Sequence, residues 1–139
     1  MIRTALATTL AVLAACAAAA QDAPDAEAGR DHYVTWCASC HGMEGRGDGT
    51  MAPILSVLPT DLTQLAADAG GAFPWMRVAR QIDGRDPFLA HGGVMPLFGD
   101  FFAGDPAAPE AALKLPDGQP MVTTLTIAEL LVYLDTIQE

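Results

Sequence analysis

Basic residues are scarce in this chain. Of its 139 residues only seven are Lys or Arg, against 17 Asp or Glu, which gives a formal net charge of −10. Such a surface repels the phosphates of nucleic acids and of anionic lipids. We therefore expect no nucleic-acid partner and no electrostatic attachment to a membrane. The acidity serves either solubility or steering toward a basic docking face on another protein.

The apolar run nearest the N-terminus, Ala5 to Ala15, is too short to span a bilayer. With Arg3 before it and small residues after it, it is typical of a secretory signal, so we predict that residues 1–20 direct export to the periplasm of a bacterium. No second apolar span and no internal repeat follows. We expect a linker over residues 21–25 and one domain over 26–139 that exists as a monomer.

Two cleavage sites compete in this signal. Ala18-Ala19-Ala20 before Gln21 suits ordinary signal cleavage, whereas Leu13-Ala14-Ala15-Cys16 resembles a lipoprotein box. The second would end the signal at Ala15 and attach lipid to Cys16. Membrane contact is expected only through that lipid, and Cys16 is otherwise discarded with the leader.

Cysteine is also scarce, with three residues in the chain. Once Cys16 is removed or lipidated, only Cys37 and Cys40 remain, and export to an oxidising compartment favours a disulfide between them unless another covalent partner takes both sulfurs. A zinc site needs more ligands than His32 and His91 can add. A thioredoxin-like site needs a strand–helix context that the pattern lacks.

The stretch Cys37-Ala38-Ser39-Cys40-His41 is a Cys-x-x-Cys-His motif for covalent haem attachment. Thiols three residues apart on one turn can reach two positions at one edge of a porphyrin, and the adjacent His41 can then present a ring nitrogen to the iron. We predict one covalently bound haem c, held by Cys37 and Cys40, with His41 as an axial ligand.

The helical signals place this motif near the end of a first helix. We predict helices over Ala26–Cys40, from Pro59-Thr60-Asp61 to about Ala69, and from Pro74 to Gly84. Residues 86–109 are expected to be irregular. Two short runs around Pro116-Asp117-Gly118 predict a hairpin, and Thr126 with Glu129 forms a capping-box pattern before a last, core-facing helix.

Over most of residues 26–139, the sequence resembles class I c-type cytochromes. The resemblance implies an all-α cytochrome c-like fold with crossed N- and C-terminal helices, here with a small β-hairpin insertion before the last helix. It implies that Gly29 and Tyr33 on the first helix meet Tyr133 on the last. It also implies that the carbonyl of Pro53 accepts the second ring N–H of His41; the alternative is an ordinary loop proline.

The second axial ligand decides whether the iron face is closed for electron transfer or open for chemistry. Met43 is too near His41, Met51 lies on the His41 side, and Met76 and Met121 are assigned to the core and the hairpin. Met95 remains, in a Gly-rich loop stiffened by Pro96. The resemblance also implies a Met-Pro ligand at this place. His91 is the rival.

Other side chains are candidates for the haem surroundings. The cationic Arg77, Arg80 and Arg85 suit the haem propionates, or else form a solvated helix face. The aromatic candidates line the haem crevice or belong to the core: Trp75, Phe88, Phe98 and Phe101.

The sequence therefore predicts a one-electron carrier, not an enzyme, that exchanges electrons with redox partner proteins of an electron-transport chain. Two alternatives stay open. One is a dedicated cytochrome subunit of an envelope dehydrogenase or oxidase, and the other is a haem sensor or peroxidatic protein with an open iron face.

Overall fold

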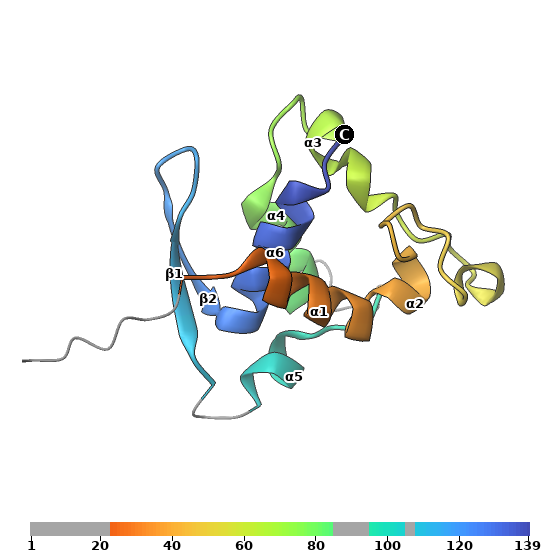
Figure 1. Cartoon of the computed structure of the whole chain (residues 1–139), viewed down its shortest axis with the longest axis horizontal. Coiled ribbons are helices and arrows are strands. Elements are labelled where there is room, and N and C mark those ends of the chain that lie inside the picture. Colours follow the sequence, from red (N-terminus) through yellow and green to blue (C-terminus); the bar gives the residue numbers. More distant parts are fainter. Residues whose placement is uncertain (1–22, 85–94, 105–107) are drawn as a thin grey trace, which may run out of the picture.

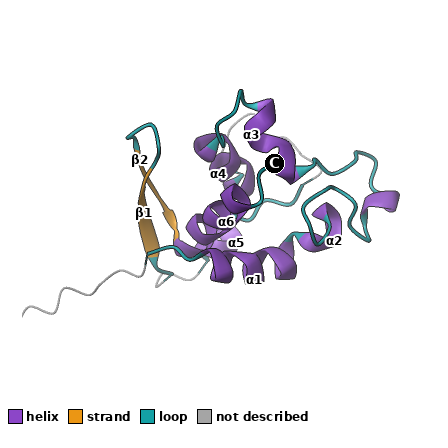
Figure 2. Ribbon diagram, turned by 45° about the horizontal axis from the view of Figure 1, so that its top comes forward, coloured by secondary structure: helices purple, strands orange, loops and turns teal. Residues whose placement is uncertain are grey.

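The computed structural model describes residues 23–84, 95–104 and 108–139. Helices surround a central pair in which α1 (Ala26–Trp36) crosses the C-terminal helix α6 (Leu125–Thr136), and a two-stranded hairpin lies to one side (Figure 1). Figure 2, coloured by secondary structure, shows that the described residues are mainly helix and loop. The predicted helical fold with a small hairpin before the last helix is confirmed.

The predicted first helix is divided into two. Asp25 caps α1 by accepting a hydrogen bond from the backbone N–H of Ala28, and α1 ends at Trp36. The short helix α2 (Ala38–His41) follows after Cys37, whose φ of −114° departs from helical values and interrupts the regular backbone. Gly42, with a positive φ of 82°, ends α2 as expected. A continuous helix over Ala26–Cys40 was therefore wrong at Cys37.

The crossing of α1 and α6 confirms the contact that the sequence resemblance implied. A Cβ on Gly29 would lie 2.9 Å from the Cβ of Tyr133, so only glycine permits this close approach. The rings of Tyr33 and Tyr133 pack with centroids 5.2 Å apart. The two helices thus form the rigid centre on which the motif at the end of α1 is placed.

The middle of the chain is built from short elements. Two 3-10 turns, η1 (Ala52–Ile54) and η2 (Leu62–Gln64), lead into α3 (Leu65–Asp68), and α4 (Trp75–Asp83) follows. Asp61 caps η2, and Pro74 precedes α4 as its N-cap, so these two predicted helix starts are confirmed within a residue. The segment expected to be irregular contains a short helix, α5 (Gly99–Ala103).

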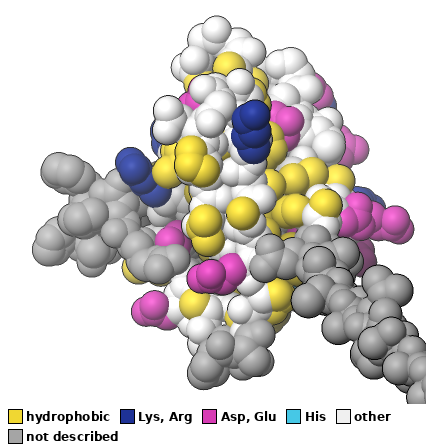
Figure 3. Space-filling model, turned by 90° about the vertical axis from the view of Figure 1, so that its left-hand side faces the viewer, with side chains coloured by type: hydrophobic (Ala, Val, Ile, Leu, Met, Phe, Trp, Pro, Cys, Tyr) yellow, Lys and Arg dark blue, Asp and Glu magenta, His cyan; other side chains and the backbone are white. Residues whose placement is uncertain are grey.

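The predicted hairpin is present. Strand β1 (Glu110–Lys114) pairs antiparallel with β2 (Pro120–Thr124), and a turn at Gly118 joins them. One face of the hairpin covers the core through Ala111 and Met121, while Val122 on the other face is 65% exposed. On this side of the molecule apolar groups reach the surface between acidic side chains (Figure 3).

The cap of α6 lies two residues earlier than predicted. The hydroxyl of Thr124 accepts a hydrogen bond from the backbone N–H of Ile127, so Thr124 is the N-cap and Thr126 already lies within the helix. The reason is that β2 runs directly into α6 with no loop between them. From this start α6 buries its apolar residues beside those of α1 and α4 in one core, whose most buried large side chains are Tyr33, Ile127, Leu130 and Leu131.

Among the described residues, none of the helices has both the length and the apolar character needed to cross a membrane.

Candidate functional site

The predicted attachment residues lie on a single turn. Cys37 precedes α2, Cys40 and His41 belong to it, and the backbone N–H groups of both donate to the carbonyl of Cys37, at 3.1 and 2.9 Å. Both cysteines are half-buried and neither forms a disulfide. The two sulfurs and the imidazole are therefore offered from one compact element, as covalent attachment of a porphyrin requires.

The imidazole of His41 is held by a backbone carbonyl. Its Nδ1 atom lies 3.0 Å from the carbonyl oxygen of Thr60, and because a carbonyl only accepts, Nδ1 carries the hydrogen. The lone pair is then on Nε2, the atom available to a metal. Burial lowers the pKa of His41, an effect that the Thr60 carbonyl partly opposes, so the neutral ring is favoured.

This contact corrects the role given to Pro53. Pro53 lies in η1 with an exposed side chain, and the acceptor that the structure gives to Nδ1 of His41 is the carbonyl of Thr60. The physical reason is the path of the loop after His41, which brings the carbonyl of Thr60, 19 positions further along the chain, to the imidazole. The sequence contained a signal for this, because Pro59 restricts the backbone directly before Thr60.

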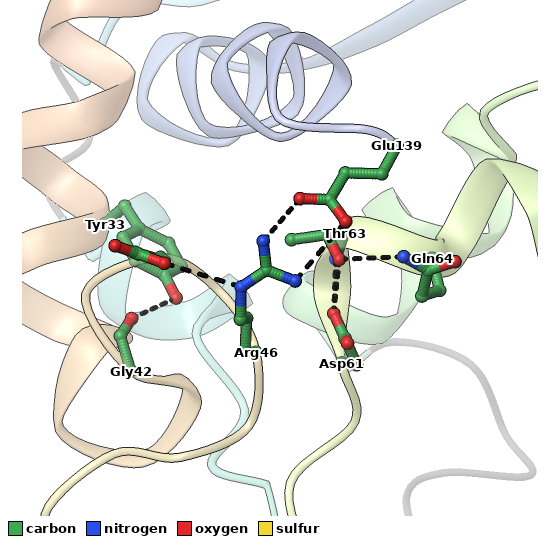
Figure 4. A network of polar contacts seen from close by, with 8 residues as sticks. Tyr33, Gly42, Arg46, Asp61, Thr63, Gln64 and Glu139 are labelled. Atoms are coloured by element: carbon green, nitrogen blue, oxygen red, sulfur yellow. Dashed lines mark hydrogen bonds and ion pairs between the residues drawn. The ribbon is translucent and has the colours of Figure 1, made fainter.

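The loop after His41 folds back on the motif. The N–H groups of Gly47 and Gly49 donate to the carbonyls of His41 and Cys40, at 2.8 and 3.1 Å. The phenol of Tyr33 donates to the carbonyl of Gly42 at 2.6 Å, a buried bond that ties α1 to the start of the loop (Figure 4). The attachment turn is thus held both by α1 and by the loop that follows it.

The thiol of Cys37 is in an apolar environment. Burial, and to a smaller extent the neighbouring Cys40, raises the pKa of Cys37 to about 11. The thiol is therefore protonated at neutral pH, which disfavours the thiolate that disulfide formation requires.

Met95 lies beside α4, close to Gln81. The N–H of Phe98 donates to the carbonyl of Ile82 at 2.9 Å, and Leu97 packs directly on Gly84, so residues 97–98 lie against the end of α4. The side-chain amide of Gln81 lies 4.0 Å from the Met95 sulfur. Met95 itself is half-buried against the apolar core.

The structure separates Met95 from the other methionines. Met43, Met51 and Met76 are each at least 39% exposed, so the assignment of Met76 to the core was wrong, because it lies on the outer face of α4. Met121 is buried beneath the hairpin. Of the methionines weighed as ligands, Met95 alone lies half-buried at the edge of the core. The rival His91 lies outside the described residues.

The remaining candidates fall into two groups. Trp75 and Phe98 border the same apolar cluster as Cys37 and Met95, and their half-buried rings suit a crevice edge. Arg77 and Arg80 lie on the exposed face of α4, and neither makes an ion pair within the part of the chain that the structure describes. Phe101 is 57% exposed and packs against Trp36. Arg85 and Phe88 lie outside the described residues.

These residues fit a haem bound through the motif. Two free sulfurs, an imidazole with Nε2 available and an apolar border that includes Cys37, Trp75, Met95 and Phe98 are the groups such a cofactor needs. Cys37 and Cys40 would hold the porphyrin, and His41 would face its iron.

The helical fold and this attachment turn are the features of a protein that binds haem covalently. Residues 26–87 match the family model for cytochrome c. The match covers less than half of the chain; it supports a c-type cytochrome with covalently bound haem c that exchanges electrons with partner proteins. It ends before α5, the hairpin and α6. No curated protein and no solved structure matches the chain.

Proposed function

We propose that the chain is a monohaem, class I c-type cytochrome that carries single electrons in the bacterial cell envelope, with His41 and Met95 as axial ligands. The haem, when bound, supplies one-electron chemistry at its iron. The rest of the function comes from the chain, which fixes the ligands, excludes water and presents a surface to redox partners.

One observation carries this proposal: the hydrogen bond from Nδ1 of His41 to the carbonyl of Thr60. It fixes the tautomer and the orientation of the ring, leaves Nε2 as the donor atom and raises its basicity. A ring held in this way changes little between two charge states of a metal, which suits electron transfer.

Met95 supports the proposal that a side chain closes the second face of the haem iron. A thioether favours the reduced metal and raises its potential, and the chain directly after Met95 is held against α4 by the Ile82–Phe98 hydrogen bond. Arg77 and Arg80 would pair with the propionates from the exposed face of the same helix.

Optical and magnetic spectroscopy of the haem-loaded protein tests the ligand pair. We expect the Met-to-iron charge-transfer band in the unsubstituted protein, its loss in Met95→Ala, and its retention in Met76→Ala, a control on the exposed face of α4. A band that is absent from the start, or that survives Met95→Ala, contradicts the assignment. Rapid stoichiometric carbon monoxide binding by the reduced protein would instead support the open-face alternative.

A second candidate, a subunit dedicated to one envelope dehydrogenase or oxidase, is favoured by one surface feature. Trp36 directly precedes Cys37, is 42% exposed and packs edge-on against the exposed Phe101, with ring centroids 4.8 Å apart. Exposed aromatics beside a redox centre suit a protein interface. Co-purification of a partner enzyme with the native protein, and its loss in Trp36→Ser, would favour the subunit over a free carrier.

The location in the cell rests on residues 1–22, which lie outside the described residues. We propose a periplasmic protein, either free or anchored through Cys16. Mass spectrometry of the protein from the envelope fraction distinguishes a start at lipidated Cys16 from a start at Gln21.

A further inference from the structure

The C-terminal end of α6 lies beside η2 and α3, far along the chain from the attachment turn (Figures 1 and 2). The side chain of Gln138 makes three hydrogen bonds there. Its Oε1 accepts from the N–H of Ala66 at 2.8 Å, and its Nε2 donates to the carbonyls of Leu62 and Leu134, at 2.8 and 2.7 Å. One half-buried amide therefore joins α6 to the first residue of η2 and to α3.

The segment that Gln138 holds begins directly after the Thr60 carbonyl. The carboxylate of Asp61 accepts two hydrogen bonds from Thr63, one from the Thr63 hydroxyl at 2.6 Å and one from the Thr63 backbone N–H at 2.9 Å. These two hydrogen bonds hold the pKa of Asp61 below its usual range. The carbonyl of Thr63 accepts from the backbone N–H of Glu139 at 2.9 Å. Residues 61–66 are thus tied to α6 at several points.

The same segment is also tied to the loop after His41. The N–H of Leu62 donates to the carbonyl of Gly45 at 2.6 Å. The guanidinium of the next residue, Arg46, pairs with both carboxylate oxygens of Glu139, and Figure 4 shows it between that carboxylate and the loop. The loop, the segment and the end of α6 therefore form one connected network around the Thr60 carbonyl.

We infer that Gln138 is a positioning residue for His41: by fixing residues 61–66 it holds the Thr60 carbonyl on Nδ1 of the imidazole. This inference rests on the proposed ligation by His41. The ion pair between Arg46 and Glu139 supports the same arrangement from the surface. Because both side chains are exposed, this ion pair contributes less than the hydrogen bonds of Gln138.

The test uses the haem-loaded full chain in its reduced state. In Gln138→Ala we expect the Nδ1–H of His41 to exchange with solvent about tenfold faster by NMR, as loss of a buried hydrogen-bonded clamp implies. The reduction potential should rise, because a ring that has lost its acceptor is a weaker donor to the oxidised metal. Gln138→Glu keeps the acceptor for Ala66 but loses both donors, so it should show the same shifts.

Thr136→Val is the matched control. It removes a hydrogen bond from Thr136 to the carbonyl of Tyr133 at the same helix end without touching residues 61–66, so the exchange rate and the potential should stay unchanged. Equal shifts in this control, or unchanged values in both Gln138 variants, overturn the inference. If His41 does not ligate the iron in the unsubstituted protein, the proposed function fails instead. Should Gln138→Ala not fold, Arg46→Gln tests the network from the exposed side, with a smaller shift in the same direction.

Discussion

Gly29 in α1 lies directly against the backbone of Glu129 in α6, and a Cβ placed on it would meet the Glu129 carbonyl and the Cβ of Tyr133, the latter at 2.9 Å. The crossing of the two helices depends on this missing side chain. Because the obstacle includes backbone, a neighbouring side chain cannot relieve the overlap by changing rotamer.

Gly29→Ala should therefore destabilise the protein, although alanine is the better helix former by about 1 kcal/mol. We expect a net loss of about 1–3 kcal/mol in the free energy of unfolding, typical of an overpacked contact. Arg30→Ala, the exposed neighbour on the same helix, should change it by less than about 0.5 kcal/mol. Denaturant unfolding measures both, and a Gly29→Ala protein as stable as its parent would show that the helices can separate without cost.

Tyr33→Phe removes the phenol that donates to the Gly42 carbonyl and leaves that carbonyl with the longer hydrogen bond from the N–H of Gly45, at 3.3 Å. We expect a loss of about 1 kcal/mol in unfolding free energy. The exposed Thr35, whose hydroxyl donates to the carbonyl of Asp31 on the same helix, provides the control in Thr35→Val, with a change below about 0.5 kcal/mol. Comparable losses in both variants would show that the Tyr33–Gly42 bond contributes nothing specific.

The same phenol predicts a pH dependence. Burial, with smaller contributions from Cys37, Tyr133 and Asp48, raises the pKa of Tyr33 above its usual value. The neutral phenol therefore stabilises the fold fully below the pKa of an unfolded tyrosine, about 10, and this contribution is lost as the pH rises above it. Stability should fall at alkaline pH, together with the onset of phenolate absorbance, and Tyr33→Phe should reduce that fall. An equal alkaline fall in the variant would contradict the assignment.

How much of the fold and of the site could be predicted from the sequence depends on how far apart along the chain the interacting residues lie. The Cys37–Cys40–His41 turn and the Gly29–Tyr133 contact followed from local spacing and from the family resemblance. The acceptor for His41 did not, because it depends on where the chain returns 19 positions after His41, and the carbonyl belongs to Thr60 rather than Pro53. Gln138 was missed for a similar reason: a polar residue at a chain end has no periodicity that marks it as a clamp.

The cap of α6 gives a direct comparison of two threonines. Thr124 is buried and its hydroxyl caps the helix, whereas Thr126, the residue that the sequence pattern favours, lies within the first turn. Thr124→Ala should cost about 1 kcal/mol of unfolding free energy and Thr126→Ala much less. Thermal unfolding of the two variants shows which threonine caps the helix. A larger loss of stability in Thr126→Ala than in Thr124→Ala would favour the capping box of Thr126 and Glu129.

The contact between Gln81 and Met95 makes the proposed ligation of the iron by Met95 testable without removing the methionine. The side-chain amide of Gln81 lies 4.0 Å from the Met95 sulfur, within reach of a weak hydrogen bond, and holds the thioether toward α4. Gln81→Leu keeps the size of the side chain but removes the donor, so Met95 should leave the iron more readily. We expect imidazole to bind the oxidised, haem-loaded protein about fivefold faster, the factor that corresponds to loss of about 1 kcal/mol. Met76→Leu, on the exposed face of the same helix, should bind imidazole at the parent rate. A Gln81→Leu protein with the parent rate would show that the hydrogen bond between Ile82 and Phe98, without Gln81, is enough to hold Met95 in place.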